Sequence, residues 1–386
     1  MTSAASELKE SDLRNWRLLE QFRHRLKPHV EATAANEADP RRKLLADDYF
    51  CLLLFGLFNP ALKSMRALCH ASARFEKMRS VCSRPLAPAS FSAAQHLFDP
   101  EILAGILRQL AREAKGRTEF GDLRVRQAVE SLTAVDGTVL RAVHRMTWAD
   151  VGKNGSAIKL HLHFSVFDQV PEEWTITVAN VCERKTLKGR VEPGKFYVAD
   201  RLYSDDYAFL GRMVRQKTDF VFRLPGNAVR TPASPARELT PEDRAAGVVS
   251  DRLEKIGAKY NGSPLRVVEI HCAGEEFVLV TSRQDLPAEL IGLIYRYRWQ
   301  IELFFKWLKS ILGSAHWLAE SPRGVAIQLY AALIASLLLV LATGKRPTKR
   351  QMEAMALYFA GLTCFPDQIK TPSTLKACRT ELRISP

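Results

Sequence analysis

The first third of the chain places its apolar residues at the three- to four-residue spacing of amphipathic helices. This pattern predicts helices over Leu8–Lys27 and Leu44–Phe58, and again within Ala93–Lys115. Asp99-Pro100 supports the last prediction, because aspartate is a preferred N-cap and proline fits the first helical position. We therefore expect an all-helical region over residues 1–120.

A second pair of this kind, Asn59-Pro60, predicts the start of another helix that runs through His70. With the preceding helix it gives a helix, short turn, helix pattern that carries Lys63, Arg66 and Arg74. A helix-turn-helix would use such basic residues to bind DNA, and an ordinary helical hairpin has the same pattern. Both interpretations remain open at this point.

The pattern changes near residue 130, where β-branched and other apolar residues begin to alternate with polar ones, as in half-buried strands. Helices return at Ala288–Leu312 and Arg323–Thr343. Strands followed by closing helices predict an α/β domain, with a mixed sheet flanked by helices. The predicted strands are Ser131–Val139, Ile158–Phe167, Thr175–Val181, Lys195–Ala199 and Phe220–Leu224, with a helix at Phe209–Gln216.

A polar, proline-containing stretch interrupts this domain after Leu224 and leads into two further strands, Leu265–Ile270 and Phe277–Thr281. The pair Ala273-Gly274 between them is a hairpin signal. The expected organisation is a helical region at 1–120, the first part of the α/β domain at 121–224, a β-rich insertion at 225–285, closing helices at 286–345 and a tail at 346–386.

The charge of the chain points to an anionic partner. Lys and Arg number 56 against 42 Asp and Glu, which gives a formal net charge of +14 and a pI near 9.5. Nucleic acid is the commonest partner of so basic a protein. The seven cysteines form no CxxC pair and are expected to be buried thiols in a reducing cytosol. The uncharged run Val325–Thr343 approaches the length of a membrane span, but its many alanines favour a buried core helix, so no membrane partner is expected.

The most informative segment lies in the predicted helix Ala288–Leu312. At about 100° per residue, Tyr295, Arg298, Glu302 and Lys309 fall on one stripe roughly 60° wide. The stripe runs beside the apolar face instead of opposing it, so Glu302 is expected to be partly covered and surrounded by cations. A carboxylate in that setting can hold a metal ion while the cations hold phosphates. The competing interpretation is a solvated charged face.

Two aspartates occupy the ends of apolar strand segments. Asp136 precedes Gly137 in the first predicted strand, and Asp200 ends the segment Phe196–Asp200. Burying a carboxylate is unfavourable unless it is paired or bound to a metal ion. Each aspartate alone also fits a turn at a strand end, but together with Glu302 the three predict one site.

The pattern Tyr-x2-Arg-x3-Glu-x6-Lys resembles the signature of insertion-sequence-4 (IS4) transposases, and Asp136 and Asp200 match the two aspartates of that family. The resemblance implies an RNase H-like catalytic domain, in which Asp136, Asp200 and Glu302 form a catalytic, metal-binding triad. The long interval between Asp200 and Glu302 resembles the β insertion of the family. The sequence departs from the family at Leu202, where glycine is frequent, which puts the shape of that turn in doubt.

The same resemblance implies two Mg²⁺ (or Mn²⁺) ions per site, double-stranded DNA as transposon end and target, and a homodimer on DNA in the bacterial cytoplasm at the nucleoid. It assigns phosphate contacts to Tyr295, Arg298 and Lys309. Trp299 and Arg223 are further DNA-binding candidates, with packing and a generic basic surface as their respective alternatives. His161 and His163 share one face of a strand, where they either neighbour the metal ions or are hydrogen-bonded histidines beside the sheet, and we expect the second.

The function expected from this resemblance is cut-and-paste transposition, in which the enzyme binds terminal inverted repeats, cleaves the strands and joins them to a target. A metal-dependent nuclease of the same fold that does not join ends is the first alternative. A domesticated DNA-binding protein without catalysis is the second, and the intact triad argues against it. Only an assay of joining separates a transposase from a nuclease.

Overall fold

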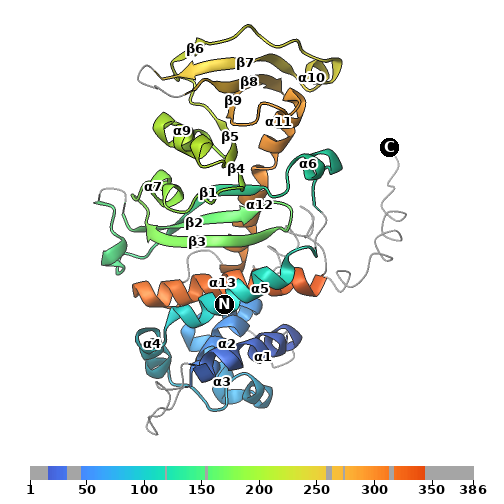
Figure 1. Cartoon of the computed structure of the whole chain (residues 1–386). Helices are drawn as coiled ribbons and strands as arrows, with labels where there is room; N and C mark the ends of the chain where they lie inside the picture. The colour runs from blue at the N-terminus through green and yellow to red at the C-terminus, as the bar shows by residue number, and fades with distance from the viewer. Residues whose placement is uncertain are drawn as a thin grey trace, which may run out of the picture. The chain divides into compact units, whose positions relative to one another are not determined.

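The computed structural model describes residues 16–32, 45–117, 120–152, 155–257, 263–272, 274–312 and 317–343. The chain divides into two compact units (Figure 1). A helical unit comprises residues 1–117 and 306–386, and an α/β unit comprises residues 118–305. The predicted C-terminal tail at 346–386 and the start of the predicted helix Leu8–Lys27 lie outside the described residues.

In the helical unit, Asp99 caps α5 (Pro100–Ala114) as predicted, because its side chain accepts a hydrogen bond from the Glu101 amide at 2.9 Å. The prediction at Asn59-Pro60 was wrong in detail. The Asn59 side chain donates back to the Phe55 carbonyl, and Pro60 opens only a short 3-10 turn. The next helix begins after Ser64, whose hydroxyl caps it. The elements before the α/β unit are α1 (Trp16–Ala32), α2 (Ala46–Phe58), η3 (Pro60–Leu62), α3 (Met65–Arg74), η4 (Glu76–Ser80), α4 (Pro88–Leu97) and α5 (Pro100–Ala114).

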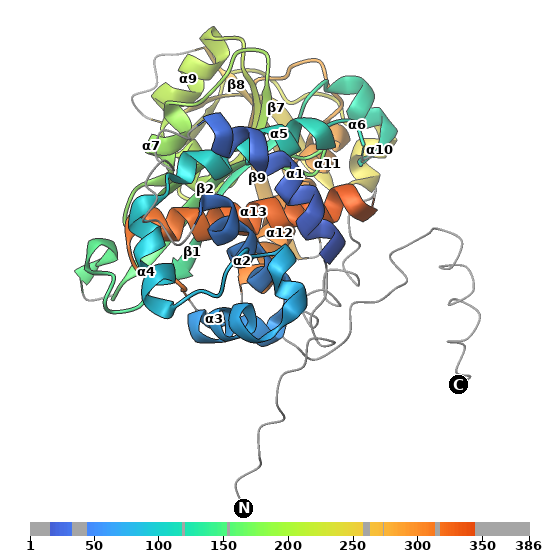
Figure 2. The same ribbon diagram turned by 90° about the horizontal axis from the view of Figure 1, so that it is seen from below.

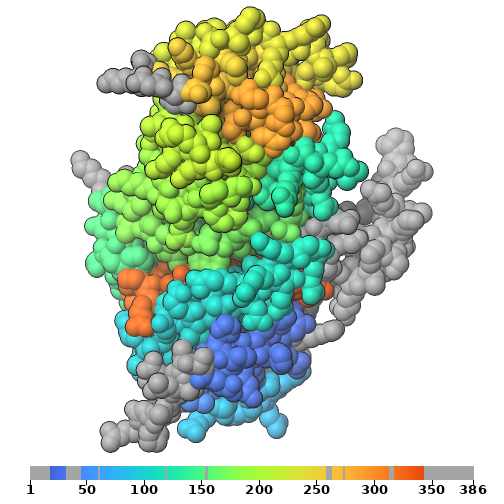
Figure 3. Space-filling view, viewed as in Figure 1, coloured from blue at the N-terminus to red at the C-terminus, as the bar shows by residue number. Residues whose placement is uncertain are grey.

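The closing helix of this unit, α13 (Pro322–Thr343), is the segment whose apolar run approaches the length of a membrane span. It contacts α5, α2, α4 and α1, and 78% of its most apolar window is buried within the protein. Figure 2 shows α13 running among these helices, and on the face drawn in Figure 3 only its ends extend beyond the cyan helices that cover it. The predicted buried core helix is therefore confirmed.

The α/β unit is built on one sheet, in which the described residues form nine strands in the order β3-β2-β1-β4-β5-β9-β8-β7-β6. β1 pairs with β4, and β4 with β5, in parallel, whereas β1–β2 and β2–β3 are antiparallel. This mixed sheet has the RNase H-like layout expected from the family resemblance. Its first five strands are β1 (Thr133–Arg141), β2 (Ala157–Ser165), β3 (Val170–Val178), β4 (Phe196–Ala199) and β5 (Asp219–Arg223).

The β-rich segment after Leu224 prolongs this sheet, because β9 pairs with β5. Its longest strand, β7, was not predicted. Two of its buried positions are Asp251 and Glu254, which Arg266 and Arg252 neutralise, so the strand lacks the usual apolar alternation. The elements of this segment are β6 (Arg230–Pro232), α10 (Pro241–Ala245), β7 (Val248–Ile256), β8 (Leu265–Cys272) and β9 (Glu275–Thr281).

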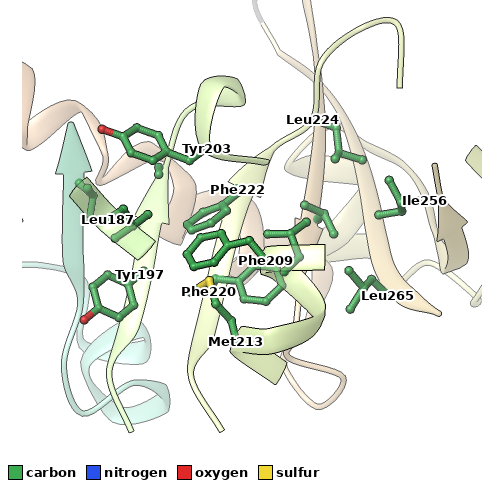
Figure 4. Packing of buried hydrophobic residues seen from close by; sticks show 14 of the residues in the cluster. Leu187, Tyr197, Tyr203, Phe209, Met213, Phe220, Phe222, Leu224, Ile256 and Leu265 are labelled. Atoms are coloured by element: carbon green, nitrogen blue, oxygen red, sulfur yellow. The ribbon is translucent and has the colours of Figure 1, made fainter. Parts of the chain in front are cut away.

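One face of the sheet is covered by short helices, and their aromatic side chains form the core shown in Figure 4. Tyr203, Phe209 and Met213 from the helices pack against Phe220 and Phe222 of β5. The opposite face carries Phe164, whose ring lies 4.9 Å from that of Phe304. The helices of this unit are α6 (Leu123–Ala128), α7 (Glu183–Lys188), α8 (Arg201–Ser204), α9 (Tyr207–Arg215), α11 (Ala288–Arg296) and the first half of α12 (Trp299–Leu312).

The single helix predicted over Ala288–Leu312 is in fact two. Around Tyr297 and Arg298 the backbone makes i to i+3 hydrogen bonds, from Arg298 to the Tyr295 carbonyl and from Ile301 to that of Arg298. These tight 3-10 turns interrupt the α-helical ladder. The prediction that Tyr295 and Glu302 lie on one stripe of a continuous helix was therefore wrong, although Arg298 still follows Tyr295 within one turn.

The cysteines depart partly from the expectation of buried thiols. Cys51, Cys69 and Cys82 are buried, but Cys182 is only partly covered and Cys272 is exposed. Cys272 ends β8 at the hairpin, where the chain reverses at the surface. Cys364 and Cys378 lie outside the described residues.

Candidate active site

Asp136 and Asp200 are brought side by side by the register of two adjacent strands. β1 and β4 pair in parallel with Thr133 opposite Tyr197 and Ala134 opposite Val198. Continuing this register by two residues sets Asp136 level with Asp200, which follows the last residue of β4 and lies beyond the paired residues. Residues two apart on a strand share a face, so both carboxylates project from the face that carries Ala134 and Val198. Neighbouring strands lie about 4.8 Å apart where they pair, and the pairing of β1 with β4 ends just before the two aspartates.

The turn after β4 fixes the carboxylate of Asp200. Asp200 is the N-cap of α8, and its Oδ1 accepts a hydrogen bond from the Leu202 amide at 2.9 Å. Among the described non-glycine residues, only Gln169 and Lys217 have positive φ angles. Leu202 therefore adopts ordinary helical geometry, and the turn forms without the glycine that is frequent in the family.

Glu302 approaches the aspartates through Arg298. Arg298 Nη1 lies 2.7 Å from Glu302 Oε1 and 4.0 Å from Asp136 Oδ2. The two acids are thus joined by one guanidinium group, on the sheet face that α12 covers. All three side chains are largely buried, with exposed fractions of 17% for Arg298, 18% for Asp136 and 28% for Glu302.

The electrostatics of Asp136 are those of a crowded carboxylate. Burial raises its pKa to about 7, and the neighbouring charges of Asp200 and Glu183 act in the same direction. The Gly137 amide and Arg298 oppose the rise. A carboxylate in these surroundings is stabilised in its charged form by a nearby cation.

The oxygen-only donor set of these acids suits Mg²⁺ or Mn²⁺ rather than zinc. Among the described residues, however, no three His, Cys, Asp or Glu side chains are gathered closely enough to enclose an ion. Glu302 contacts Arg298 instead. The donor set therefore matches a divalent cation in its chemistry, whereas the arrangement of the described side chains does not enclose one.

The other predicted DNA-contacting residues occupy different settings. Tyr295 is buried at the end of α11, and the Arg298 guanidinium lies 5.7 Å from the centre of its ring. Trp299 is 47% exposed at the start of α12. Arg223 ends β5, stacks 4.6 Å over the Phe277 ring and donates to the Glu276 carbonyl. Lys309 lies about two turns beyond Glu302 in α12, and burial lowers its pKa.

His161 and His163 lie away from the acids. In the β1–β2 register Asp136 faces Leu162, so both histidines project from the opposite face of the sheet. His161 Nε2 lies 2.8 Å from the Thr177 hydroxyl, and the His163 ring packs edge-on against Tyr197. For His161 the expected hydrogen bond is confirmed.

One acid near the site was missed by the sequence reasoning. Glu183, the first residue of α7, is 8% exposed and is one of the charges that raise the pKa of Asp136. It lies in a polar segment with no spacing rule that links it to Asp136. The only local signal was Gly137, whose missing side chain leaves room for it.

Comparisons with known proteins identify the family of the chain. The chain matches the family described as Transposase DDE domain over residues 127–338, which is more than half of its length. It is 29% identical to transposase y4zB of Sinorhizobium fredii over 269 residues, covering 67% of this chain and 71% of the relative. It is 27% identical over 242 residues to a protein of Geobacillus stearothermophilus named as the transposase for insertion sequence element IS5377, covering 62% of this chain and 61% of that relative.

Among solved structures, the piggyBac transposase in a synaptic complex with hairpin DNA matches with a TM-score of 0.45 and 10% sequence identity, over 96% of this chain and 86% of that one. The chain belongs to the DDE transposase domain family and is an insertion-sequence transposase of the IS4 type.

Proposed function

We propose that this transposase binds the terminal inverted repeats of its insertion sequence and catalyses metal-dependent cleavage and joining of DNA strands. The observation that carries the proposal is the register of β1 and β4, which sets Asp136 level with Asp200 on the sheet face covered by α12. Arg298 bridges Glu302 and Asp136 on this face. Acidic side chains from β1, from the end of β4 and from α12 supply the kind of oxygen donors that two-metal phosphoryl transfer requires.

In this proposal Asp136 and Asp200 hold Mg²⁺ or Mn²⁺ through their carboxylate oxygens, and Glu302 completes the set after it exchanges Arg298 for the cation. Two bound ions would activate the attacking oxygen and stabilise the leaving 3′ oxygen of an in-line displacement. The DNA phosphate supplies the new partner for the Arg298 guanidinium, which suits bidentate phosphate contacts. Release of Glu302 is thereby coupled to the arrival of DNA.

The neighbouring residues guide the DNA strand. Tyr295 and Lys309 contact phosphates near the cleaved end. Trp299, exposed at the start of α12, offers a flat surface for a base, and Arg223 adds positive charge at the end of β5. The helical region at 1–120 contributes binding of the terminal repeat, two subunits each hold one end, and the enzyme acts in the bacterial cytoplasm at the nucleoid.

Joining requires no external energy source. After cleavage, the freed 3′ hydroxyl replaces water as the nucleophile and attacks a target phosphate, so one phosphodiester bond forms as another breaks. The same carboxylates serve both steps because the charge distribution at phosphorus is the same.

The test is a cleavage and joining assay with a labelled duplex bearing the terminal repeat, a target plasmid and Mg²⁺. We expect the wild type to give both cleaved and joined products, and Glu302→Gln to give neither while still binding the duplex. The matched control is Glu269→Gln, an acid of the β-rich segment that is ion-paired to Arg230 at 2.7 Å. Cleavage without joining would indicate a nuclease, and binding without cleavage by the wild type would contradict catalysis.

A further inference from the structure

A further carboxylate, that of Glu183, lies on the face of β1 opposite to Asp136. Glu183 Oε1 lies 2.9 Å from Lys159 Nζ, and its Oε2 accepts a hydrogen bond from the Tyr203 hydroxyl at 3.1 Å. Lys159 stands opposite Val139 in the β1–β2 pair, on the same face as Gly137. Both oxygens of Glu183 are therefore held, one from β2 and one from α8.

Gly137 is part of this arrangement. A Cβ atom at Gly137 would lie 2.9 Å from both the carboxyl carbon and Oε1 of Glu183, closer than real contacts allow. The Glu183 carboxyl group thus rests on the backbone of β1 immediately after Asp136. Any side chain at position 137 would displace it, which explains glycine at a strand position where it otherwise weakens the structure.

Tyr203 connects the same carboxylate to Asp200. Tyr203 lies in α8, the short helix that Asp200 caps, and its ring is 1% exposed in the aromatic core beside Leu187 (Figure 4). The chain of contacts runs from Asp136 through Gly137 to Glu183, and from there through Tyr203 to α8 and Asp200. β4 has already ended at Ala199, so no strand pairing fixes the distance between the two aspartates at this level.

We propose that Glu183 is a positioning residue, which together with Lys159 and Tyr203 sets the separation of Asp136 and Asp200 and thereby their affinity for a divalent cation. This inference rests on the proposed function. The negative charge of Glu183 also acts on Asp136 across the strand, which favours a cation beside the two aspartates. Outer contacts of this kind determine how well ligands are oriented toward a metal ion.

The experiment measures Mn²⁺ binding to the full chain without DNA, by titration calorimetry, for three variants and the wild type. Glu183→Gln keeps the shape of the side chain and removes its charge. Tyr203→Phe keeps the ring in the core and removes the hydroxyl. Glu269→Gln is the matched control, because it removes the same charge from a partly buried, ion-paired acid in the β-rich segment.

We expect Glu183→Gln and Tyr203→Phe each to weaken Mn²⁺ binding, by roughly 10-fold for Glu183→Gln, while Glu269→Gln binds as the wild type does. In the cleavage assay the two variants should need more Mg²⁺ for half-maximal rate and recover most of the wild-type rate at saturating Mg²⁺. Circular dichroism and duplex binding without metal should be unchanged, which separates positioning from misfolding.

Wild-type Mn²⁺ affinity in either Glu183→Gln or Tyr203→Phe would overturn the inference and leave the proposed function intact. A loss of cleavage in Glu183→Gln that saturating Mg²⁺ does not restore would also overturn it, because a positioning role predicts recovery. If the wild type itself neither binds Mn²⁺ nor cleaves the duplex, the proposed function fails, and this inference fails with it.

Discussion

At the scale of single residues, Arg298 has the most consequential contacts. Its guanidinium lies between Glu302 and Asp136 and over the Tyr295 ring, so one side chain links three of the four signature positions to the first aspartate. Arginine remains charged under all ordinary conditions. In the proposed mechanism it therefore competes with a cation for the carboxylates until a phosphate binds it.

This competition predicts opposite effects of one substitution on two ligands. Arg298→Gln should strengthen Mn²⁺ binding several-fold in the absence of DNA, because a positive charge has left the acids. It should weaken binding of the terminal duplex and abolish joining. Calorimetric titration with Mn²⁺ and a duplex-binding assay measure the two effects, and weaker Mn²⁺ binding by the variant would refute the competition.

Arg266 provides a residue-scale test of stability. It is 1% exposed and donates to both oxygens of Asp251, at 2.9 and 2.7 Å, and to the carbonyls of Arg283 and Leu286. Arg266→Met would leave the buried Asp251 with only the more distant Arg237, at 4.0 Å, so we expect the free energy of unfolding to fall by about 3–5 kcal/mol. Denaturant titration measures this change.

The control for this prediction is the double variant Arg266→Met with Asp251→Leu, which removes both charges. Replacing a buried ion pair by apolar residues is often neutral, so the double variant should recover much of the lost stability. Equal destabilisation of the single and double variants would show that the carbonyl contacts dominate over the ion pair.

His163 predicts a dependence of stability on pH. Burial lowers its pKa to about 4, and the charges of Arg190 and Lys195 act in the same direction. The unfolded chain, with a histidine pKa of about 6.5, therefore binds more protons than the folded one between these values. The stabilising contribution is complete above pH 6.5 and is lost as the pH falls toward 4, by roughly 3 kcal/mol.

Unfolding titrations from pH 7 to 4 check this for the wild type and His163→Phe. The variant should lose less stability over the range, whereas His144→Phe, at an exposed loop position, should follow the wild type. A His163→Phe profile as steep as that of the wild type would assign the acid sensitivity to other groups.

At the scale of elements, α3 presents a basic surface. Its inner side chains include Leu68 and Ser72, whereas Arg66, His70 and Arg74 are exposed. From Lys63 to Arg84 the chain carries six basic residues and a single acid, Glu76. The sequence left two interpretations open for this basic segment, a helix-turn-helix and a helical hairpin. In the structure, basic residues of α3 face outward, which is the placement that a DNA-binding surface requires.

We expect Arg66→Ala and Arg74→Ala each to weaken duplex binding and to reduce the slope of log affinity against log salt by about 1 if the arginine contacts one phosphate. Arg108→Ala, on the exposed side of α5, is the control and should change neither quantity. Unchanged salt slopes for both α3 variants would place the DNA elsewhere on the protein.

The elements also show which structure the sequence could predict. β4, β9 and α5 were expected because their signals are local: a short apolar run, a hairpin and an Asp-Pro cap. β7 was not expected, because its buried acids become compatible with a strand only when arginines from β8 and from β7 itself neutralise them. The break between α11 and α12 is likewise absent from the helical pattern, because it depends on backbone hydrogen bonding around Arg298.

At the scale of the whole chain, the fold and the family were predictable because the signature places chemically distinctive residues at fixed spacing. Asp136 and Asp200 are separated by the same number of residues as Ala134 and Val198. This equal separation indicates that the two aspartates are level only once β1 and β4 are known to pair in parallel. The Glu183 contacts could not be predicted, because they join residues of β2, α7 and α8 that are far apart in the sequence. Long-range contacts of this kind leave no periodic trace in the sequence.

The central claim, that Asp136 is a metal ligand of the reaction, is tested most directly by exchanging its oxygen for sulfur. A thiolate binds Mg²⁺ poorly and Mn²⁺ better. We predict that Asp136→Cys cleaves the terminal duplex too slowly to detect in Mg²⁺ and regains cleavage in Mn²⁺, whereas Asp136→Ala remains inactive in both. Cleavage by Asp136→Cys at the wild-type rate in Mg²⁺, or equal activity of the cysteine and alanine variants in Mn²⁺, would contradict the claim.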